Sequence, residues 1–236
     1  MKFPVWATVF MVVCAVLLFR LGFWQLERHE WKASLLKSLD EAYAIDASAH
    51  PLLQIGARPE DLHEYERGYV EGEYLFDRKI LLGPRLHDKA PGYHLLVPLK
   101  IGGIILFVNR GWVPEGYSAE SDDSIRVRVT GLLRTPDRAN FSVPLNNPEK
   151  NLWFRYDLEG FAKSRGISPV LPFVLYAETE SFPADTPRES LSPLPQLSRP
   201  QLSNNHLSYA FFWFTMGVLL IFFYLLRFHN KSSRES

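Results

Sequence analysis

Two long apolar segments lie near the ends of the chain. The first covers residues 3–19 and, with residues 20–24, reaches the roughly 20 residues that a helix needs to cross a bilayer. The second covers residues 209–226 and lies between the polar stretches "LSNN" and "RFHNKSSRES". This pattern predicts transmembrane helices over 3–24 and 206–226.

The orientation of these two spans follows from their flanks. A cleaved signal peptide is not favoured, because no small-x-small cleavage site follows the first segment. Two spans place both termini in one compartment and the loop between them in the other. Cations near the termini favour a cytoplasmic location of both chain ends: Lys2, Arg227, Lys231 and Arg234. Cations after the first span favour the opposite orientation: Arg20, Arg28 and Lys32. Long loops are translocated largely regardless of charge, so we predict a cytoplasmic tail at 227–236 and an extracytoplasmic loop.

The middle of the chain changes from helical to strand-like patterning. Good helix formers continue after the first span, which predicts a helical extension over 25–45. From 46 to 182, short β-branched and aromatic segments are separated by Gly, Pro, Asp or Asn, and a short helix capped by Asp157 and Gly166 interrupts them. The expected strands are "YVEGEYLF", "KILLGPR", "YHLLVPLK", "GGIILFVNRG", "IRVRVTGLLR", "LWFRYDL" and "PFVLYAE".

The predicted fold class is therefore a membrane α+β protein. Two transmembrane helices flank an extracytoplasmic, mostly antiparallel β domain with few helices, arranged as a barrel or a sandwich. Residues 183–205 are rich in proline and should form an extended tether back to the membrane.

Composition excludes several classes of function. The 236 residues carry zero formal net charge, which gives no footprint for nucleic acid. The single cysteine, Cys14, allows neither an intramolecular disulfide nor a cysteine metal site. No nucleophile elbow, phosphate loop, dinucleotide fingerprint or zinc-protease motif occurs, and the seven histidines are not paired at metal-ligand spacing. We therefore expect a protein that is not an enzyme.

His206 stands at the start of the second span. Ser203, Asn204 and Asn205 are good N-cap residues, so the helix should begin near them and His206 should fall in its first turn. The positive end of a helix dipole disfavours an added cation, and neutral imidazole is the form that ligates metal ions. His206 is thus a candidate metal ligand.

The helical face that starts at His206 carries small and aromatic residues. It continues through Ala210, Trp213 and Gly217, with Tyr209 beside it. The small residues leave room either for a flat group or for a neighbouring helix, and the aromatic ones are suited to an apolar macrocycle. A histidine at a membrane interface also commonly hydrogen-bonds to headgroups or water, so both interpretations stay open here.

A second aromatic and cationic set follows the first span. Trp24, Arg28 and Trp31 recur at i, i+4 and i+7, which is also the ordinary composition of an interfacial belt. Because the two spans form an antiparallel hairpin, Arg20 and Trp24 should lie at the membrane level of His206. Cations suited to carboxylates would then converge on a histidine ligand.

The segment "VNRGWVP" ends a predicted strand with an amide, a guanidinium and an indole. Asn109, Arg110 and Trp112 are candidate partner-binding residues, because a guanidinium fork suits carboxylates. The alternative is structural: Arg110 pairs with a carboxylate of its own domain while Gly111 allows a tight turn.

Several of these motifs together resemble the Surfeit locus protein 1 family. "LGFWQLERHEWK" is similar to the family's signature after the first span, and "LGPR", "PGYHLLVPL", "VNRGWVP", "VTGLLR", "FSVPLNNPEKNLWFRYDL" and "NNHLSYAFFWF" follow in the family's order. The resemblance implies an assembly factor for heme-copper cytochrome c oxidase that binds heme a transiently and helps insert it into the catalytic subunit. It also makes the histidine of "NNHLSY", His206, the favoured heme ligand.

The resemblance also implies a cofactor site, partners and a cellular location. The predicted cofactor site comprises His206 on the iron with Tyr209, Trp213, Arg20, Trp24 and Arg28 around the macrocycle. The expected partners are oxidase subunits, above all the heme-bearing one, together with heme a synthase and the lipid bilayer. No mitochondrial presequence precedes the first span, which favours a bacterial inner membrane with a periplasmic loop. The alternative function is a membrane-tethered interaction module that stabilises an assembly intermediate without carrying heme.

Overall fold

The computed structural model describes residues 4–53, 62–117, 124–136, 141–183 and 204–232, and nearly all of the predicted tether lies outside these ranges. The chain divides into two compact units, Met1–Leu39 with Gln201–Ser236 and Asp40–Pro200. The elements are α1 (Val5–Ala44), β1 (Arg67–Leu75), η2 (Phe76–Arg78), β2 (Ile80–His87), β3 (Ala90–Ile101), β4 (Ile104–Pro114), β5 (Ser124–Arg134), η3 (Pro148–Lys150), α2 (Leu158–Arg165), β6 (Val170–Ser181) and α3 (His206–Ser232). We call the first unit the helix pair and the second the β domain.

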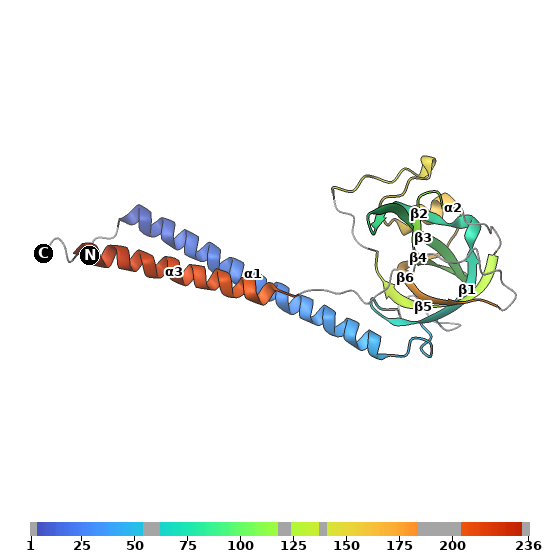
Figure 1. The fold of residues 1–236 in the computed structure, drawn as a ribbon, viewed down its shortest axis with the longest axis horizontal. Coiled ribbons are helices and arrows are strands. Elements are labelled where there is room, and N and C mark those ends of the chain that lie inside the picture. Colours follow the sequence, from blue (N-terminus) through green and yellow to red (C-terminus); the bar gives the residue numbers. More distant parts are fainter. Residues whose placement is uncertain (1–3, 54–61, 118–123, 137–140, 184–203, 233–236) are drawn as a thin grey trace. The chain divides into compact units, whose positions relative to one another are not determined.

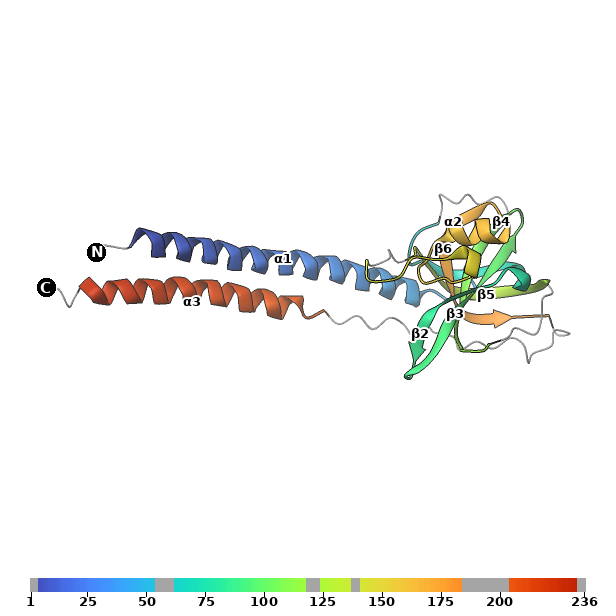
Figure 2. The ribbon, with the colours of Figure 1, turned by 90° about the horizontal axis from the view of Figure 1, so that it is seen from above.

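The helix pair consists of α3 and most of α1, which lie side by side and antiparallel in both views (Figures 1 and 2). Both helices are long and apolar enough to cross a membrane. In each of them only 11% of the most apolar stretch is buried, so neither resembles the core helix of a soluble protein. These two helices and the strand-rich domain between them confirm the predicted fold class.

The sheet of the β domain closes on itself (Figure 1). Its strand order is β1-β5-β6-β4-β3-β2, and an additional pairing joins β1 to β3. The long strand β3 makes this possible, because its first part pairs with β2 and its last residues, Leu99 and Lys100, pair with β1. Strands β4 and β6 run parallel, and the other pairs are antiparallel, as predicted. The sheet is therefore a barrel, with β2 as an extension.

Two hydrophobic clusters form on opposite faces of this sheet. Alternation along β4 separates them, because successive side chains of a strand point to opposite faces. Leu106 and Val108 belong to the inner cluster, whereas Phe107 belongs to the outer one. The outer cluster also contains Trp153 and, from α2, Phe161. Their rings meet edge to face with centroids 4.8 Å apart. Helix α2 thus covers part of the barrel wall.

The short helix was predicted correctly and one strand was not. Asp157 caps α2 by accepting from the Gly160 amide, and Gly166 ends the helix in the left-handed conformation. The segment "LWFRYDL" is not a strand but makes only isolated bridges. The reason is Asn146, whose side-chain oxygen accepts from the Phe154 and Arg155 amides and so takes the donors that a strand would offer to a neighbour.

Candidate functional site

The helices of the pair approach closely at small residues. Ala15 and Gly22 of α1 are seven positions apart, as are Ala210 and Gly217 of α3, and all four are buried. A heptad spacing of this kind keeps one stripe of each helix against its partner. The stripe sets the register of the pair.

Aromatic rings from the opposite helix fill the space that these small residues leave. A Cβ atom on Gly22 would meet the Phe214 ring at 2.6 Å, and one on Gly217 would meet the Phe19 ring at 3.2 Å. Of the two interpretations given to Ala210 and Gly217, the geometry therefore supports packing of a neighbouring helix. A flat ligand has no room between the helices at this depth.

His206 is the first residue of α3, and the Tyr209 amide donates to the Asn205 carbonyl just before it. The imidazole Nδ1 lies 2.7 Å from Oε1 of Gln25 on α1. An amide oxygen only accepts hydrogen bonds, so Nδ1 must carry the proton in this contact. Nε2 of a neutral ring then carries the lone pair with which a histidine binds a metal ion.

A second histidine is held in the same way one turn further along α1. Nδ1 of His29 lies 3.1 Å from Oδ1 of Asn204, and the Asn204 amide nitrogen donates to the His29 carbonyl at 3.2 Å. Asn204 thereby fixes both the ring and the backbone of His29. The mouth of the helix pair, which we define as Gln25, His29, Asn204 and His206, therefore contains two imidazoles.

Two contacts define the two flanks of the helix pair. On one flank Phe23 meets Phe214 with ring centroids 5.2 Å apart, and on the other Gln25 meets His206. Arg28 follows Gln25 by three positions and so lies on the His206 flank. We call this side the histidine flank.

Tyr209 and Trp213 lie on the histidine flank of α3. Tyr209 follows His206 by three positions and Trp213 by seven, which keeps both near its side of the helix. Tyr209 is 57% exposed, and the Trp213 ring is half-buried. The structure thus brings His206, Tyr209, Trp213 and Arg28 to one side of the pair.

Arg20 and Trp24 lie elsewhere. Each is two positions from Gly22, which is about 200° around an ideal helix and so opposite the contact with α3. Trp24 is 49% exposed, and Arg20 makes an exposed ion pair with Glu27 at 3.8 Å. Both are therefore turned away from α3, although Trp24 precedes Arg28 by four positions and adjoins it on α1, and their role in cofactor binding stays a prediction.

In the β domain, Arg110 points into the barrel. Its side chain is 0% exposed and donates two hydrogen bonds to Glu180 of β6, Nε to Oε1 at 2.7 Å and Nη2 to Oε2 at 2.6 Å. The Tyr74 hydroxyl donates to the same carboxylate at 2.6 Å. The pKa of Tyr74 is raised well above its ordinary value, mainly by burial and secondly by the charge of Glu180. The hydroxyl therefore stays protonated and can donate. Arg110 therefore pairs with a carboxylate of its own domain.

A β-bulge aims Arg110 inward and Trp112 outward. His94 pairs with Trp112 and Leu96 with Asn109, so two residues of β4 oppose one residue of β3. Gly111 has a φ of 115° and its amide donates to the Asn109 side chain at 2.9 Å. The expected tight turn at Gly111 is therefore wrong: the glycine serves a bulge within β4.

On the outer face of β4, Asn109 and Trp112 also bond within the domain. The Asn109 amide nitrogen donates to Tyr156 at 3.0 Å, and the Trp112 indole donates to the Arg85 carbonyl at 3.1 Å. His94 lies beside Asn109, and burial, with the charge of Arg85, lowers its pKa to about 4. Asn109, Arg110 and Trp112 are thus all buried, and partner binding by them stays a prediction.

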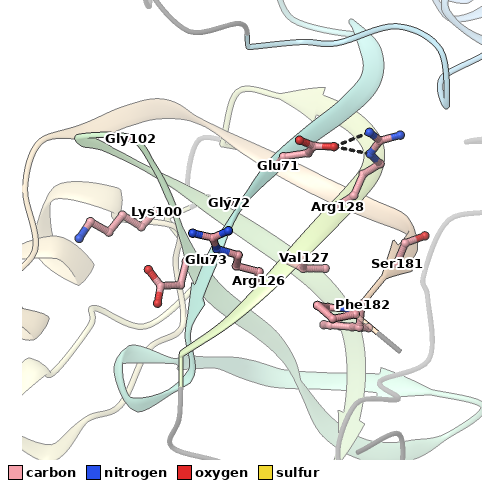
Figure 3. Close-up of a pocket in the computed structure, with 11 residues that line it drawn as sticks. Glu71, Gly72, Glu73, Lys100, Gly102, Arg126, Val127, Arg128, Ser181 and Phe182 are labelled. Carbon is pink, nitrogen blue, oxygen red and sulfur yellow. Dashed lines mark hydrogen bonds and ion pairs between the residues drawn. The ribbon is translucent and has the colours of Figure 1, made fainter. Parts of the chain in front are cut away.

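A surface groove of about 560 Å³ lies over β1 and β5 (Figure 3). Acidic and basic side chains alternate along it, and Glu71 accepts from Arg128 across the two strands. Phe182 supplies an apolar side. Among the described residues no group of three or more His, Cys, Asp and Glu is arranged to hold a metal ion.

Sequence reasoning missed Gln25, His29 and Asn204 at the mouth and Glu180 in the barrel. The mouth residues had a usable signal, because Ala15, Gly22 and His29 follow one another at intervals of seven and so share one helix face. Glu180 had none, since it reaches Arg110 only once β6 has paired with β4 and β5, which are distant in sequence.

The two units define a class of protein: a small β-barrel domain in one chain with a pair of helices of membrane-spanning length. A family model described as the SURF1 family matches residues 12–218. The chain belongs to this family, which comprises cytochrome oxidase assembly factors rather than catalysts.

Individual relatives match over most of their length. A SURF1-like protein of Dictyostelium discoideum is 27% identical over 246 residues, which cover 89% of this chain and 91% of that protein. A SURF1-like protein of Rickettsia bellii is 26% identical over 229 residues, 94% of this chain and 91% of the relative. Surfeit locus protein 1 of Rattus norvegicus is 26% identical over 254 residues, 98% of this chain and 78% of the relative. The similarity therefore extends to both helices as well as the β domain.

Proposed function

We propose that this chain binds heme a at the mouth of its helix pair and helps insert it into the heme-bearing subunit of cytochrome c oxidase. The observation that carries the proposal is the contact between His206 Nδ1 and Gln25 Oε1. Histidines that ligate metals usually donate their other ring nitrogen to an oxygen, which fixes the tautomer and the ring orientation. His206 has this arrangement, and it starts a helix of membrane-spanning length.

The chain's own residues would share the work as follows. His206 would hold the iron through its Nε2 lone pair, which would supply the cofactor with an imidazole ligand. Tyr209 and Trp213 offer apolar ring faces on the histidine flank, where an isoprenoid tail remains in the bilayer. Arg28 lies on the same flank for a propionate, and Trp31 holds its guanidinium at 4.0 Å from the ring centroid. Arg20 and Trp24 lie on the face of α1 turned away from α3. They belong to the proposed site only if the macrocycle extends around α1 to that face.

This site suits a carrier better than a resident cofactor site. Close packing at Gly22 and Gly217 keeps the macrocycle at the mouth and on the flank of the pair, where it stays accessible to a recipient. We place the chain in a bacterial inner membrane, with cytoplasmic termini and a periplasmic β domain. In that orientation the mouth lies near the periplasmic side of the bilayer, close to oxidase subunits and to heme a synthase.

A second function is a membrane-tethered interaction module that stabilises an assembly intermediate without heme. The observation in its favour is the open groove over β1 and β5, which is lined by both charges and by Phe182 (Figure 3). Under this alternative the β domain alone carries the activity, and His206 only anchors the interface.

A transfer experiment separates the two functions. Chain purified in detergent and loaded with heme a is mixed with heme-bearing subunit made in cells that lack heme a, and heme in the recipient is measured after separation. We expect transfer from the parent and from His63→Ala, an exposed histidine of the β domain, and none from His206→Ala. Equal assembly support by the parent and His206→Ala, without transfer by either, would favour the interaction module.

A further inference from the structure

The second imidazole at the mouth of the helix pair belongs to His29, and the proposed function does not yet assign it a role. We infer that His29 is the second axial ligand of the heme a iron that His206 holds, so that the mouth is a bis-histidine site. This inference rests on the proposed function and adds to it the coordination number and the identity of the second ligand.

Register brings the two imidazoles within about one helical turn of each other along the pair. Gln25 and His29 are four residues apart on α1, about 6 Å along the axis and on the same face. Their partners, His206 and Asn204, are two residues apart on the facing segment. The two histidines therefore come from opposite helices within one turn of each other, as a ligand pair on opposite faces of one macrocycle requires.

Both rings are prepared in the same chemical state. Each has Nδ1 against an amide oxygen, at 2.7 Å for His206 and 3.1 Å for His29, so each keeps Nε2 for a ligand. Asn204 also donates to the His29 carbonyl, which fixes the start of α3 to the α1 residue that bears the ring.

The position along the helices also allows a macrocycle. At the depth of Gly22 the Phe214 ring fills the space between the helices. At His29 the situation differs, because α3 begins only at His206 and Asn204 precedes it. Helix α3 thus begins at this level, about two turns before Phe214, so the ring that fills the space at Gly22 does not reach it.

A purely structural role for His29 makes a different prediction. If its ring only ties Asn204 to α1, a glutamine, whose amide donates to the same oxygen, should replace it without loss. If Nε2 binds iron, glutamine removes a strong-field imidazole and changes the spin state even when the helix contact survives. His29→Gln therefore distinguishes a ligand from a spacer.

The test is the spin state of ferric heme a in the detergent-purified, heme a-loaded full chain, measured by electron paramagnetic resonance and visible absorption. We expect a six-coordinate low-spin signal in the parent and in His63→Ala, and a five-coordinate high-spin signal in both His29→Ala and His29→Gln. Free imidazole added to His29→Ala should restore the low-spin signal, which shows that the variant is folded around its remaining ligand. His206→Ala should lose most of its heme.

The outcomes separate this inference from the proposed function. A high-spin parent, or a His29→Gln protein whose low-spin signal equals that of the parent, overturns the second-ligand assignment while the bound heme leaves the carrier function standing. Failure of His29→Ala to respond to imidazole overturns it as well. A parent that takes up no heme a overturns both.

Discussion

In the β domain the guanidinium of Arg110 has both of its Glu180 contacts inside the barrel, and the Tyr74 hydroxyl completes the carboxylate's shell. At the mouth of the helix pair, by contrast, the contacts among the described residues hold each imidazole through Nδ1, to an amide of the other segment. A network in which polar groups satisfy one another specifies a fold, whereas a ring fixed on one side is ready to bind on the other. The comparison therefore assigns stability to "VNRGWVP" and ligand binding to "NNHLSY".

The largest expected effect is in the β domain. Glu180→Gln replaces the carboxylate with an uncharged amide, so the buried Arg110 guanidinium loses its counter-charge and one of its two acceptor oxygens. Breaking a buried pair lowers the free energy of unfolding by about 3–5 kcal/mol. Urea unfolding of the detergent-solubilised chain, followed by β-sheet circular dichroism, measures this loss.

Matched controls come from the same sheet. Glu71→Gln removes an exposed pair with Arg128, so it should cost less than about 1 kcal/mol. Equal effects of Glu180→Gln and Glu71→Gln would show that the barrel network does not determine stability, and the assignment of Arg110 to the fold would fail.

A pH dependence of about 3 kcal/mol is expected from His94. Burial lowers its folded pKa to about 4, from 6.5 in the unfolded chain. Between these values the unfolded state binds a proton that the folded state does not, so stability falls as pH decreases from 6.5 to about 4 and is unaffected by this group above 6.5.

The check is the unfolding free energy against pH for the parent and His94→Gln. Removing the titrating ring should flatten the curve in that interval. An unchanged slope in the variant would assign the dependence to other groups.

Gln25→Leu tests the helix pair. It keeps the size of the side chain and removes the oxygen that orients His206, and loss of such a partner typically lowers metal affinity 10–100-fold. Titration of heme a into the purified variant measures this change. The β domain should unfold at the parent's urea concentration, and a variant with parental heme affinity would remove Gln25 from the site.

The smallest effects concern the two cations. Arg28→Gln should weaken heme a binding by about two- to fivefold, the effect of one partly exposed charge contact, whereas Arg20→Gln, about two turns from Arg28 on the face of α1 turned away from α3, should leave it unchanged. The same heme titration compares them. A larger loss with Arg20→Gln would place the macrocycle on the outer face of α1.

Periodicity is sufficient to predict the helices, most strands and the capped helix α2, because each depends on residues close in sequence. The strand expected at "LWFRYDL" failed because the Asn146 side chain takes its backbone donors, which no local pattern reveals. Closure of the barrel depends on pairing between β1 and the end of β3.

The sites show the same division. His206 could be selected from its position at a helix start. Its partner Gln25 lies 181 residues away, and which residue of α1 meets His206 depends on how α1 is rotated about its own axis. That rotation also separates Arg28 from Arg20, which sequence spacing alone had placed in one set.

The most direct measurement is the visible absorption spectrum of the detergent-purified chain from cells shown to make heme a, beside its His206→Ala variant. We expect a heme a band in the parent that is absent from the variant, with equal β-sheet circular dichroism in both proteins. A band of equal height in the two proteins, or none in either, would contradict the claim that the imidazole at the mouth of the helix pair holds heme.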